Sequence, residues 1–305
     1  MKRLLLGAAL ATLCSTSAMA QTIGVSVAYF DDNFLTSMRN AMQAEAENQG
    51  WDIQFLDAQG DIGRQLSQTQ SLAAQGVDAI IINPVDTAAT SMMTQTAVES
   101  GIPLVYVNRQ PEGDDLDHED VAFVGSEQRV AGELQMQALA ERLGGEGRVA
   151  VMLGELSSSA THERTAGVES VFDAYPGLEL VDMQTADYQR TEAIDLMNNW
   201  IVGGERIDAI AANNDEMALG ALIAMKQSGI SPTDILVGGI DATRDALDAM
   251  QRGELAVSVF QDPVGQGGGA VEVAIDLANG EPVESINMVP FQLVTPDNLD
   301  DFLTN

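Results

Sequence analysis

The chain has 305 residues, with 46 acidic against 14 basic side chains and a formal net charge of −32 at pH 7. A surface this acidic repels phosphate backbones and anionic headgroups, so the charge argues against nucleic acid as a partner. The acidity favours solubility. Adaptation to a saline medium, which would screen the self-repulsion, is an alternative that the sequence leaves open.

The N-terminal end has the three parts of a secretory signal peptide. A basic pair, Lys2-Arg3, precedes an apolar stretch over 4–13 and a small-residue cleavage site over 18–20. The apolar stretch is too short to remain as a transmembrane helix. We therefore expect export to the periplasm, removal of this segment, and a mature chain that begins at Gln21.

The single cysteine, Cys14, lies inside that segment. The mature chain is thus expected to contain neither a disulfide nor a thiol nucleophile. A lipid anchor on Cys14 would need small residues directly before it, and Thr12-Leu13 fit that pattern poorly.

Short apolar runs alternate with amphipathic stretches along the rest of the chain. Leu35, Met38 and Met42 share one face of the first helical stretch, which Gly50 ends. Runs this continuously apolar predict parallel strands that are covered on both faces of a sheet. The predicted strands are 23–27, 53–56, 79–82, 103–107, 121–124, 149–153, 178–181, 209–212, 235–237 and 256–261.

About ten strands are too many for one compact sheet, and the rhythm restarts near Gly125-Ser126. The sequence therefore predicts an α/β protein of two doubly wound, Rossmann-like lobes. No Pro/Gly/Ser-rich linker separates the two sets. Short crossings of the chain between the lobes would act as a hinge.

Polar side chains follow many of the predicted strands. Ligands of doubly wound sheets bind beyond the carboxyl ends of the strands. Arginine, aspartate and the amides suit vicinal hydroxyls, and two aromatic side chains can cover the faces of a ring. Each residue alone could equally cap a helix or tie a loop, but their convergence predicts a binding site. The candidates are Asp32, Phe34, Asn83, Asn108, Arg109, Arg164, Tyr188, Asn214, Asp241 and Gln261.

No pattern of catalytic or metal-binding residues emerges. His118 and His162 lack partners at metal-ligand spacing, so both are interpreted as solvated surface residues. The acidic loop 112–120 lacks the spaced ligands of a calcium loop, although a cation there is an open alternative. We expect no metal, no cofactor and no catalysis.

Two glycine-rich runs and one serine run do not match known motifs. The glycines at 267–269 are not followed by the lysine of a P-loop, and those at 238–239 lack the dinucleotide spacing, which favours close packing or hinge freedom. The serines at 157–159 lack the flanking glycines of a nucleophile elbow. They predict a helix start whose free N–H groups face the cleft.

Eight sequence blocks resemble ribose-type periplasmic binding proteins, in the order that this family shows, from one end of the mature chain to the other. The block at 214–220, Asn-Asp-Glu-Met-Ala-Leu-Gly, is the most specific of them. Within the family the chain is most similar to the branch for myo-inositol and related cyclitols. The blocks lie at 30–34, 82–86, 107–110, 160–164, 185–188, 214–220, 239–241 and 260–262.

The resemblance implies two lobes joined by three crossings, which close over one sugar and then dock on an inner-membrane ABC permease. A monomer is expected. The resemblance implies that eight of the candidates contact the ligand, namely Phe34, Asn83, Arg109, Arg164, Tyr188, Asn214, Asp241 and Gln261. It also implies these divisions: signal peptide 1–20, N-terminal lobe 22–125 plus 262–290, and C-terminal lobe 126–261 plus 291–305.

Four positions depart from the ribose-type pattern. Asp32 stands where asparagine is usual, Leu35 and Tyr188 where phenylalanine is usual, and Asn108 where aspartate is usual. One aromatic fewer and a changed hydrogen-bond set favour a cyclitol such as myo-inositol. Ribose or another aldose, such as allose or xylose, remains the alternative.

Two other classes of function compete with transport. Sugar-responsive repressors share a related core, but they need a DNA-binding helix pair and a basic face, whereas this chain is acidic and begins with an export signal. A sugar-acting enzyme would need a catalytic constellation that the sequence lacks.

Overall fold

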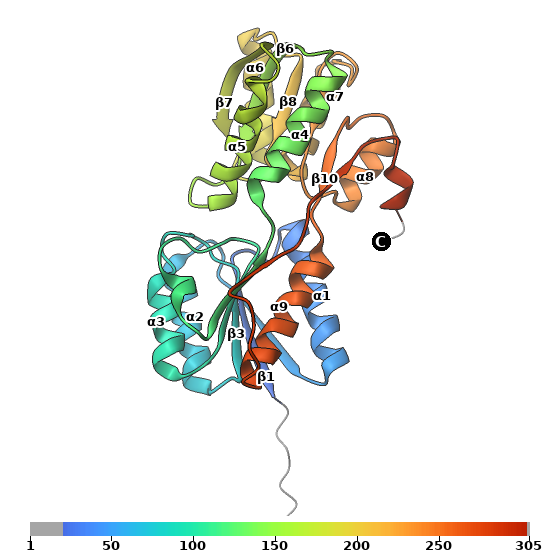
Figure 1. The fold of residues 1–305 in the computed structure, drawn as a ribbon. Helices are drawn as coiled ribbons and strands as arrows, with labels where there is room; N and C mark the ends of the chain where they lie inside the picture. The colour runs from blue at the N-terminus through green and yellow to red at the C-terminus, as the bar shows by residue number, and fades with distance from the viewer. Residues whose placement is uncertain (1–20, 304–305) are drawn as a thin grey trace, which may run out of the picture.

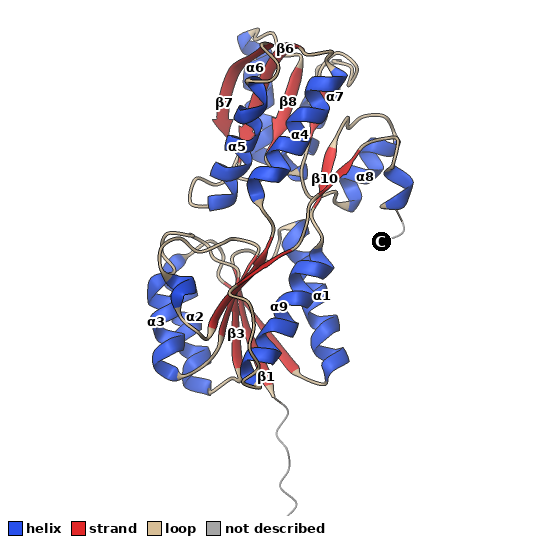
Figure 2. Cartoon of the chain, viewed as in Figure 1, coloured by secondary structure: helices blue, strands red, loops and turns tan. Residues whose placement is uncertain are grey.

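The computed structural model describes residues 21–303 and arranges them in two lobes, each built on its own parallel sheet (Figure 1). Figure 2 shows the strands sandwiched between helices in both lobes. The predicted pair of doubly wound α/β lobes is therefore confirmed. No helix among residues 21–303 combines the length and apolar character that a membrane span requires.

The first lobe, here called the N-terminal lobe, has a six-stranded sheet in the order β11-β5-β4-β3-β1-β2. Helices α1 and α9 pack together on one face, and α2 and α3 pack together on the other. Its elements are β1 (Thr22–Val27), α1 (Asn33–Gln49), β2 (Asp52–Asp57), α2 (Ile62–Gln75), β3 (Ala79–Ile82), α3 (Ser91–Ser100), β4 (Leu104–Val107), η1 (Asp115–Asp117), β5 (Val121–Gly125), α9 (Pro263–Ala278) and β11 (Ile286–Met288).

The C-terminal lobe repeats this winding around a sheet in the order β7-β6-β8-β9, which β10 extends through isolated bridges and an antiparallel pairing with β12. Helices α4 and α5 cover one face, and α6 and α7 cover the other. Its elements are α4 (Gln128–Arg142), β6 (Glu146–Leu153), α5 (Ser159–Phe172), β7 (Gly177–Thr185), α6 (Arg190–Gly203), β8 (Ala209–Ala212), α7 (Asp215–Gln227), β9 (Leu236–Gly238), α8 (Arg244–Gln251), β10 (Ser258–Phe260), β12 (Gln292–Val294) and η2 (Leu299–Asp301).

Local sequence explains where several elements begin and end. Every residue of β3 and of β4 is buried, as expected for strands covered on both faces. Helix α1 starts because Asp32 accepts a hydrogen bond from the N–H of Leu35, and it ends where Gly50 adopts a φ of 76°. Gly267 lets α9 approach α1 closely, because a Cβ there would collide with the carbonyl oxygen of Met38. Of the glycines at 267–269, this packing requires only Gly267, because a Cβ at Gly268 or Gly269 would meet no atom closer than 3.5 Å.

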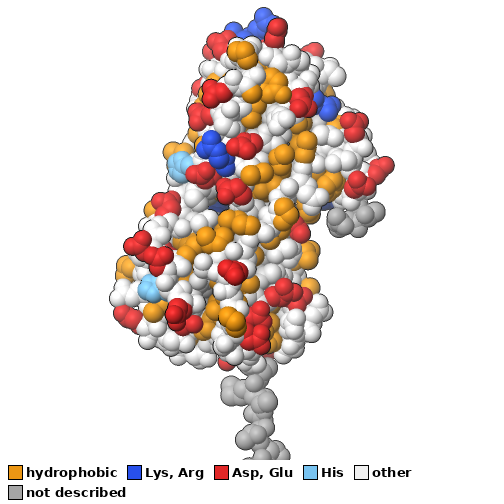
Figure 3. Space-filling view, viewed as in Figure 1, with side chains coloured by type: hydrophobic (Ala, Val, Ile, Leu, Met, Phe, Trp, Pro, Cys, Tyr) orange, Lys and Arg blue, Asp and Glu red, His pale blue; other side chains and the backbone are white. Residues whose placement is uncertain are grey.

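The chain passes between the lobes three times, from β5 to α4, from β10 to α9 and from β11 to β12 (Figure 1). The last two of these strands, β11 and β12, were not predicted from the sequence. We propose to divide the lobes within these crossings, as 22–125 plus 262–290 and 126–261 plus 291–305. The signal-peptide segment 1–20 lies outside the described residues. Figure 3 shows acidic side chains spread over the visible face of both lobes.

Candidate ligand-binding site

A cavity of about 350 Å³, including space open to solvent, lies between the lobes. Five lining residues come from the N-terminal lobe, five from the C-terminal lobe, and one follows β10 at a crossing. Nine of the ten sequence candidates line it, together with Leu35 and Ala160. The lining residues are Asp32, Phe34, Leu35, Asn108, Arg109, Ala160, Arg164, Tyr188, Asn214, Asp241 and Gln261.

The sheet order explains this convergence. In both lobes the first strand, β1 or β6, lies between the two strands that follow it in the sequence. The connection after β1 therefore leads to one side of the sheet and the connection after its neighbour β3 to the other, and β6 and β8 are related in the same way. Such a switch point opens a crevice at the carboxyl ends. Asp32 caps α1 just after β1, and Asn214 caps α7 just after β8, where its Oδ1 accepts from the N–H of Met217 at 3.0 Å.

Asp241 and Arg164 form the charged centre of the cavity. Asp241 is 7% exposed and Arg164 is 4% exposed, and Arg164 Nη1 lies 3.8 Å from Asp241 Oδ1. Arg164 also donates to Gln128, to Gln261 and to the carbonyl of Asn213. Within residues 21–303, the carboxylate of Asp241 receives no hydrogen bond. A buried carboxylate with unused acceptor sites suits the hydroxyl groups of a ligand.

Arg109 supplies a second guanidinium from the N-terminal lobe. Its Nη1 donates to the carbonyls of Pro84 and Val85 at 3.3 and 3.4 Å, which fixes the side chain at the end of β3. The same nitrogen lies 3.0 Å from Glu155 Oε2 of the other lobe, and the guanidinium carbon lies 5.8 Å from the Tyr188 ring centroid. Arg109 therefore contacts both lobes beside the cavity.

Aromatic and aliphatic side chains form the apolar walls. Phe34 and Leu35, on the first turn of α1, are 7% and 3% exposed. Tyr188 lies over Gly154, where a Cβ would collide with its ring, and its hydroxyl is 2.7 Å from Thr161 Oγ1. Tyr188 has a φ of 61°, an unusual conformation for a bulky residue. Such strain is concentrated at functional sites.

Asn83 is the one candidate that does not line the cavity. It is fully buried behind Asn108, where its Oδ1 accepts from the N–H of Ala28 and its Nδ2 donates to Asn108 Oδ1 at 3.2 Å. In this structure Asn83 orients the lining residue Asn108 and does not itself line the cavity, and its contact with a ligand stays a prediction.

Direct hydrogen bonds between the lobes hold the cavity closed. Thr87 in the N-terminal lobe accepts from the N–H of Ser159 at 3.1 Å and donates through its own N–H to the carbonyl of Ser157 at 3.1 Å. On α1, Asn33 Nδ2 donates to Glu216 Oε1 at 2.7 Å. The serines at 157–159 do begin a helix, but the free N–H of Ser159 bonds the opposite lobe and not the cavity.

Burial dominates the electrostatics of the carboxyl groups at the site. It raises the pKa of Asp32 and raises the pKa of Asp241 well above its usual range, although Arg164 opposes the second shift. Burial also raises the pKa of Asp215 to about 7, despite hydrogen bonds from Ser258 and Thr243. Through these bonds Asp215 holds the loop that carries Asp241.

The remaining titratable features lie elsewhere. His118 and His162 are both exposed, and His162 Nε2 is 2.9 Å from the carbonyl oxygen of Leu156. In the acidic loop 112–120, Asp115 is buried and accepts from Thr90 Oγ1 at 2.6 Å. Among the described residues, no group of three or more His, Cys, Asp or Glu side chains is placed to hold a metal ion.

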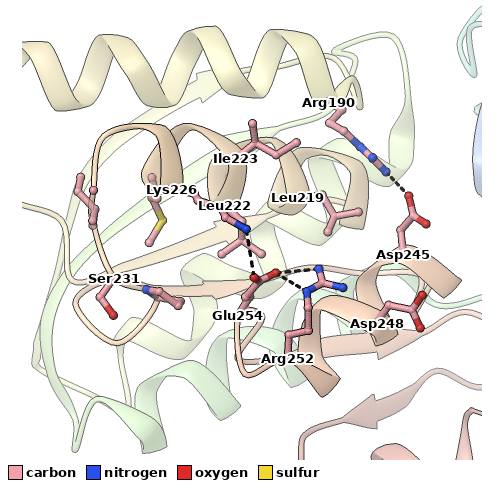
Figure 4. A pocket seen from close by; sticks show the side chains of 14 residues that line it. Arg190, Leu219, Leu222, Ile223, Lys226, Ser231, Asp245, Asp248, Arg252 and Glu254 are labelled. Carbon is pink, nitrogen blue, oxygen red and sulfur yellow. Dashed lines mark hydrogen bonds and ion pairs between the residues drawn. The ribbon is translucent and has the colours of Figure 1, made fainter.

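A larger hollow, of about 1160 Å³ including open solvent, lies within the C-terminal lobe between α7 and α8 (Figure 4). Leu219 and Leu222 are among its lining residues. Its cations are paired, since Lys226 Nζ lies 3.8 Å and Arg252 Nη2 lies 2.7 Å from Glu254. The hollow shares no lining residue with the interlobe cavity, and nothing among the described residues indicates an occupant.

Two doubly wound lobes that enclose a polar cavity are typical of hinged solute-binding proteins. Comparison with known proteins identifies the family. Residues 23–282 match the model of the periplasmic binding protein domain, and the chain belongs to this family.

The similar proteins bind small solutes. The chain is 49% identical to a putative rhizopine-binding protein of Rhizobium meliloti over 305 residues, which is 99% of each chain. It is 36% identical over 274 residues to the ribose import binding protein RbsB of Bacillus subtilis, covering 90% of this chain and 87% of the relative. These relatives are binding proteins and not enzymes.

Solved structures agree with this assignment. An ABC transporter solute-binding protein from Bacillus halodurans with bound myo-inositol superposes with a TM-score of 0.89 and 43% identity, over 95% of this chain and 99% of that chain. The Caulobacter myo-inositol binding protein, bound to myo-inositol, gives a TM-score of 0.85 and 28% identity, over 93% and 96%. The chain is thus a sugar-binding periplasmic component of the ABC-transporter type.

Proposed function

We propose that this protein captures a cyclitol, with myo-inositol favoured, by closing its two lobes around one molecule and then delivers it to an inner-membrane ABC permease. The proposed class of ligand rests on one observation, the pair of Asp241 and Arg164 in the closed cavity. A buried acceptor beside a buried donor suits a ring with several hydroxyl groups.

The relatives narrow the choice of ligand. Two similar solved structures hold myo-inositol, a curated relative is named for rhizopine, and another is named for ribose. Ribose or another aldose is therefore the alternative ligand. Leu35 and Asn108, which depart from the ribose-type pattern, both line the cavity and support the cyclitol.

Three further points complete the proposal. The N-terminal segment acts as a cleaved signal peptide that delivers the chain to the periplasm. The protein works as a monomer, and it does not bind nucleic acid. It releases its ligand chemically unchanged, as expected for a relative of transport binding proteins.

A thermal-shift screen of the mature protein tests the proposal. Inositols, a rhizopine, pentoses and hexoses are added separately, and ligand well above its dissociation constant raises stability by about 1.4 kcal/mol per tenfold gain in affinity. We expect the largest shift with myo-inositol or a near relative. No shift with any cyclitol or monosaccharide would contradict the proposal, and ligand recovered in altered form would indicate an enzyme.

A further inference from the structure

A chain of buried amides runs behind the cavity, and its polarity is set independently from each lobe. On the N-terminal side, the N–H of Ala28 donates to Asn83 Oδ1, and Asn83 Nδ2 donates to the carbonyl of Val107. Asn83 therefore offers only its Nδ2 to Asn108 Oδ1, at 3.2 Å. Asn108 must then turn its own Nδ2 toward Gln266, and it donates to Gln266 Oε1 at 3.1 Å.

The C-terminal side reaches the same atom from the opposite direction. Arg164 carries only donors, and its Nη2 donates to Gln261 Oε1 at 2.6 Å. Gln261 thus turns its Nε2 toward α9 and donates to Gln266 Oε1 at 3.2 Å. Because a guanidinium cannot accept a hydrogen bond, this half of the chain also has one possible polarity.

We propose that Gln266 is a positioning residue that sets ligand selectivity from behind the cavity. It is fully buried on the first turns of α9 and does not line the cavity. Its Oε1 accepts from one lining residue on each side, Asn108 and Gln261, while its Nε2 donates to Ser126 Oγ at 2.8 Å. The inference rests on the proposed function, because it assigns a supporting part to the same site.

The consequence for selectivity follows from the amide of Asn108. With its Oδ1 held by Asn83 and its Nδ2 held by Gln266, only one N–H and one lone pair are left over, and their directions are fixed. Fixed directions distinguish an axial from an equatorial hydroxyl. Without an acceptor at Gln266, Asn108 is held by Asn83 alone. Its Nδ2 can then shift, and both of its N–H groups become free to serve hydroxyl groups of either epimer.

The test is Gln266→Met, which keeps the length of the side chain and removes both polar atoms. Calorimetry measures wild type and variant against myo-inositol and its single-hydroxyl epimers. We expect the affinity for the preferred inositol to fall about tenfold, as for one lost buried hydrogen bond, and the preference between epimers to shrink at least fivefold. In an Asn108→Ala background, Gln266→Met should lower the affinity for the preferred inositol by less than about threefold.

Ser126→Ala is the matched control, because it removes the other partner of Gln266 and leaves both bonds to its Oε1. We expect it to keep the epimer preference of wild type. If Gln266→Met does not fold, Gln266→Glu retains both acceptor bonds and should keep the ranking of epimers.

Several results overturn the inference. For Gln266→Met, these results are an equal loss of affinity for every epimer, an unchanged preference between epimers, or a loss of affinity that is just as large in the Asn108→Ala background. For the other two variants, they are a collapsed epimer preference in Ser126→Ala or a changed ranking of the epimers in Gln266→Glu. A wild-type protein that binds no polyol contradicts the proposed function instead, so the two failures are distinguishable.

Discussion

Arg109 and Glu155 form an ion pair across the cleft, with 3.0 Å between Nη1 and Oε2 and side chains that are 8% and 15% exposed. The atoms are close, but their directions do not make a hydrogen bond, so the attraction is mainly that of the charges. Arg109 belongs to the N-terminal lobe and Glu155 follows β6. The pair therefore exists only while the lobes are closed.

Glu155→Gln should weaken binding by favouring the open form. Removing one charge of a mostly buried pair leaves Arg109 partly unpaired, and we expect a loss of about 1–2 kcal/mol, or roughly 5- to 30-fold in affinity. Stopped-flow measurements should show most of the loss as faster dissociation. The control is Glu133→Gln, which removes an exposed pair with Arg129 inside α4 and should change nothing. Equal dissociation rates for Glu155→Gln and wild type would contradict this role.

Arg164→Ala should be more damaging. The substitution removes the donor beside Asp241 and leaves that carboxylate buried without its cation, so affinity should fall by about 2–4 kcal/mol, or roughly 30- to 1000-fold. Calorimetry measures the loss of affinity. Thermal melting of the ligand-free variant measures the folding stability that is lost with the hydrogen bonds to Gln128 and Gln261, so the two effects can be separated. Binding within threefold of wild type would show that the site is misplaced.

Asp215 should give the protein an unusual pH dependence. Its folded pKa of about 7 lies above the usual aspartate value, so between about pH 4 and 7 the folded state holds a proton that the unfolded state has released. This group therefore contributes more stability at low pH and loses that contribution as the pH rises through 7. The slope is at most about 1.4 kcal/mol per pH unit.

Asp215→Asn removes this titration and provides the comparison. Urea unfolding of wild type and variant at pH 5, 6, 7 and 8 gives two stability curves. We expect the difference in the free energy of unfolding, wild type minus variant, to decrease as the pH rises and to level off above about pH 8. A difference that stays constant across this range would mean that Asp215 titrates normally.

Closure should be visible in solution. The contacts of Thr87 with Ser157 and Ser159, and of Asn33 with Glu216, require approach of the lobes. Small-angle scattering should therefore give a smaller radius of gyration with saturating ligand than without it. An identical radius in both states would argue against hinge closure.

Much of the fold and site was predictable because strand ends are marked by sequence. The buried strands β3 and β4 are continuous apolar runs, and polar residues such as Asn108 and Arg109 follow β4 directly. Strands β11 and β12 were missed because each has only three residues and is partly exposed, so neither presents an apolar run. They become strands through pairing with β5 and β10, which is a tertiary effect.

The position of Asn83 shows the limit of the same reasoning. In the sequence, an asparagine at a strand end has the same pattern whether its side chain faces the cavity or lies behind it. The position of Asn83 behind the cavity depends on the packing of Asn108 in front of it, which is a tertiary contact. Glu155 and Gln266 were missed for the opposite reason. Glu155 gains its partner across the cleft, and Gln266 meets Asn108 from 158 residues away along the chain.

Isothermal titration of the mature protein with myo-inositol and with D-ribose tests the central claim most directly. The account predicts saturable binding of one molecule per chain, with myo-inositol bound more tightly than ribose. Ribose bound more tightly than every inositol would contradict the ligand assignment, and no saturable binding of any cyclitol or monosaccharide would contradict the proposed capture between the lobes.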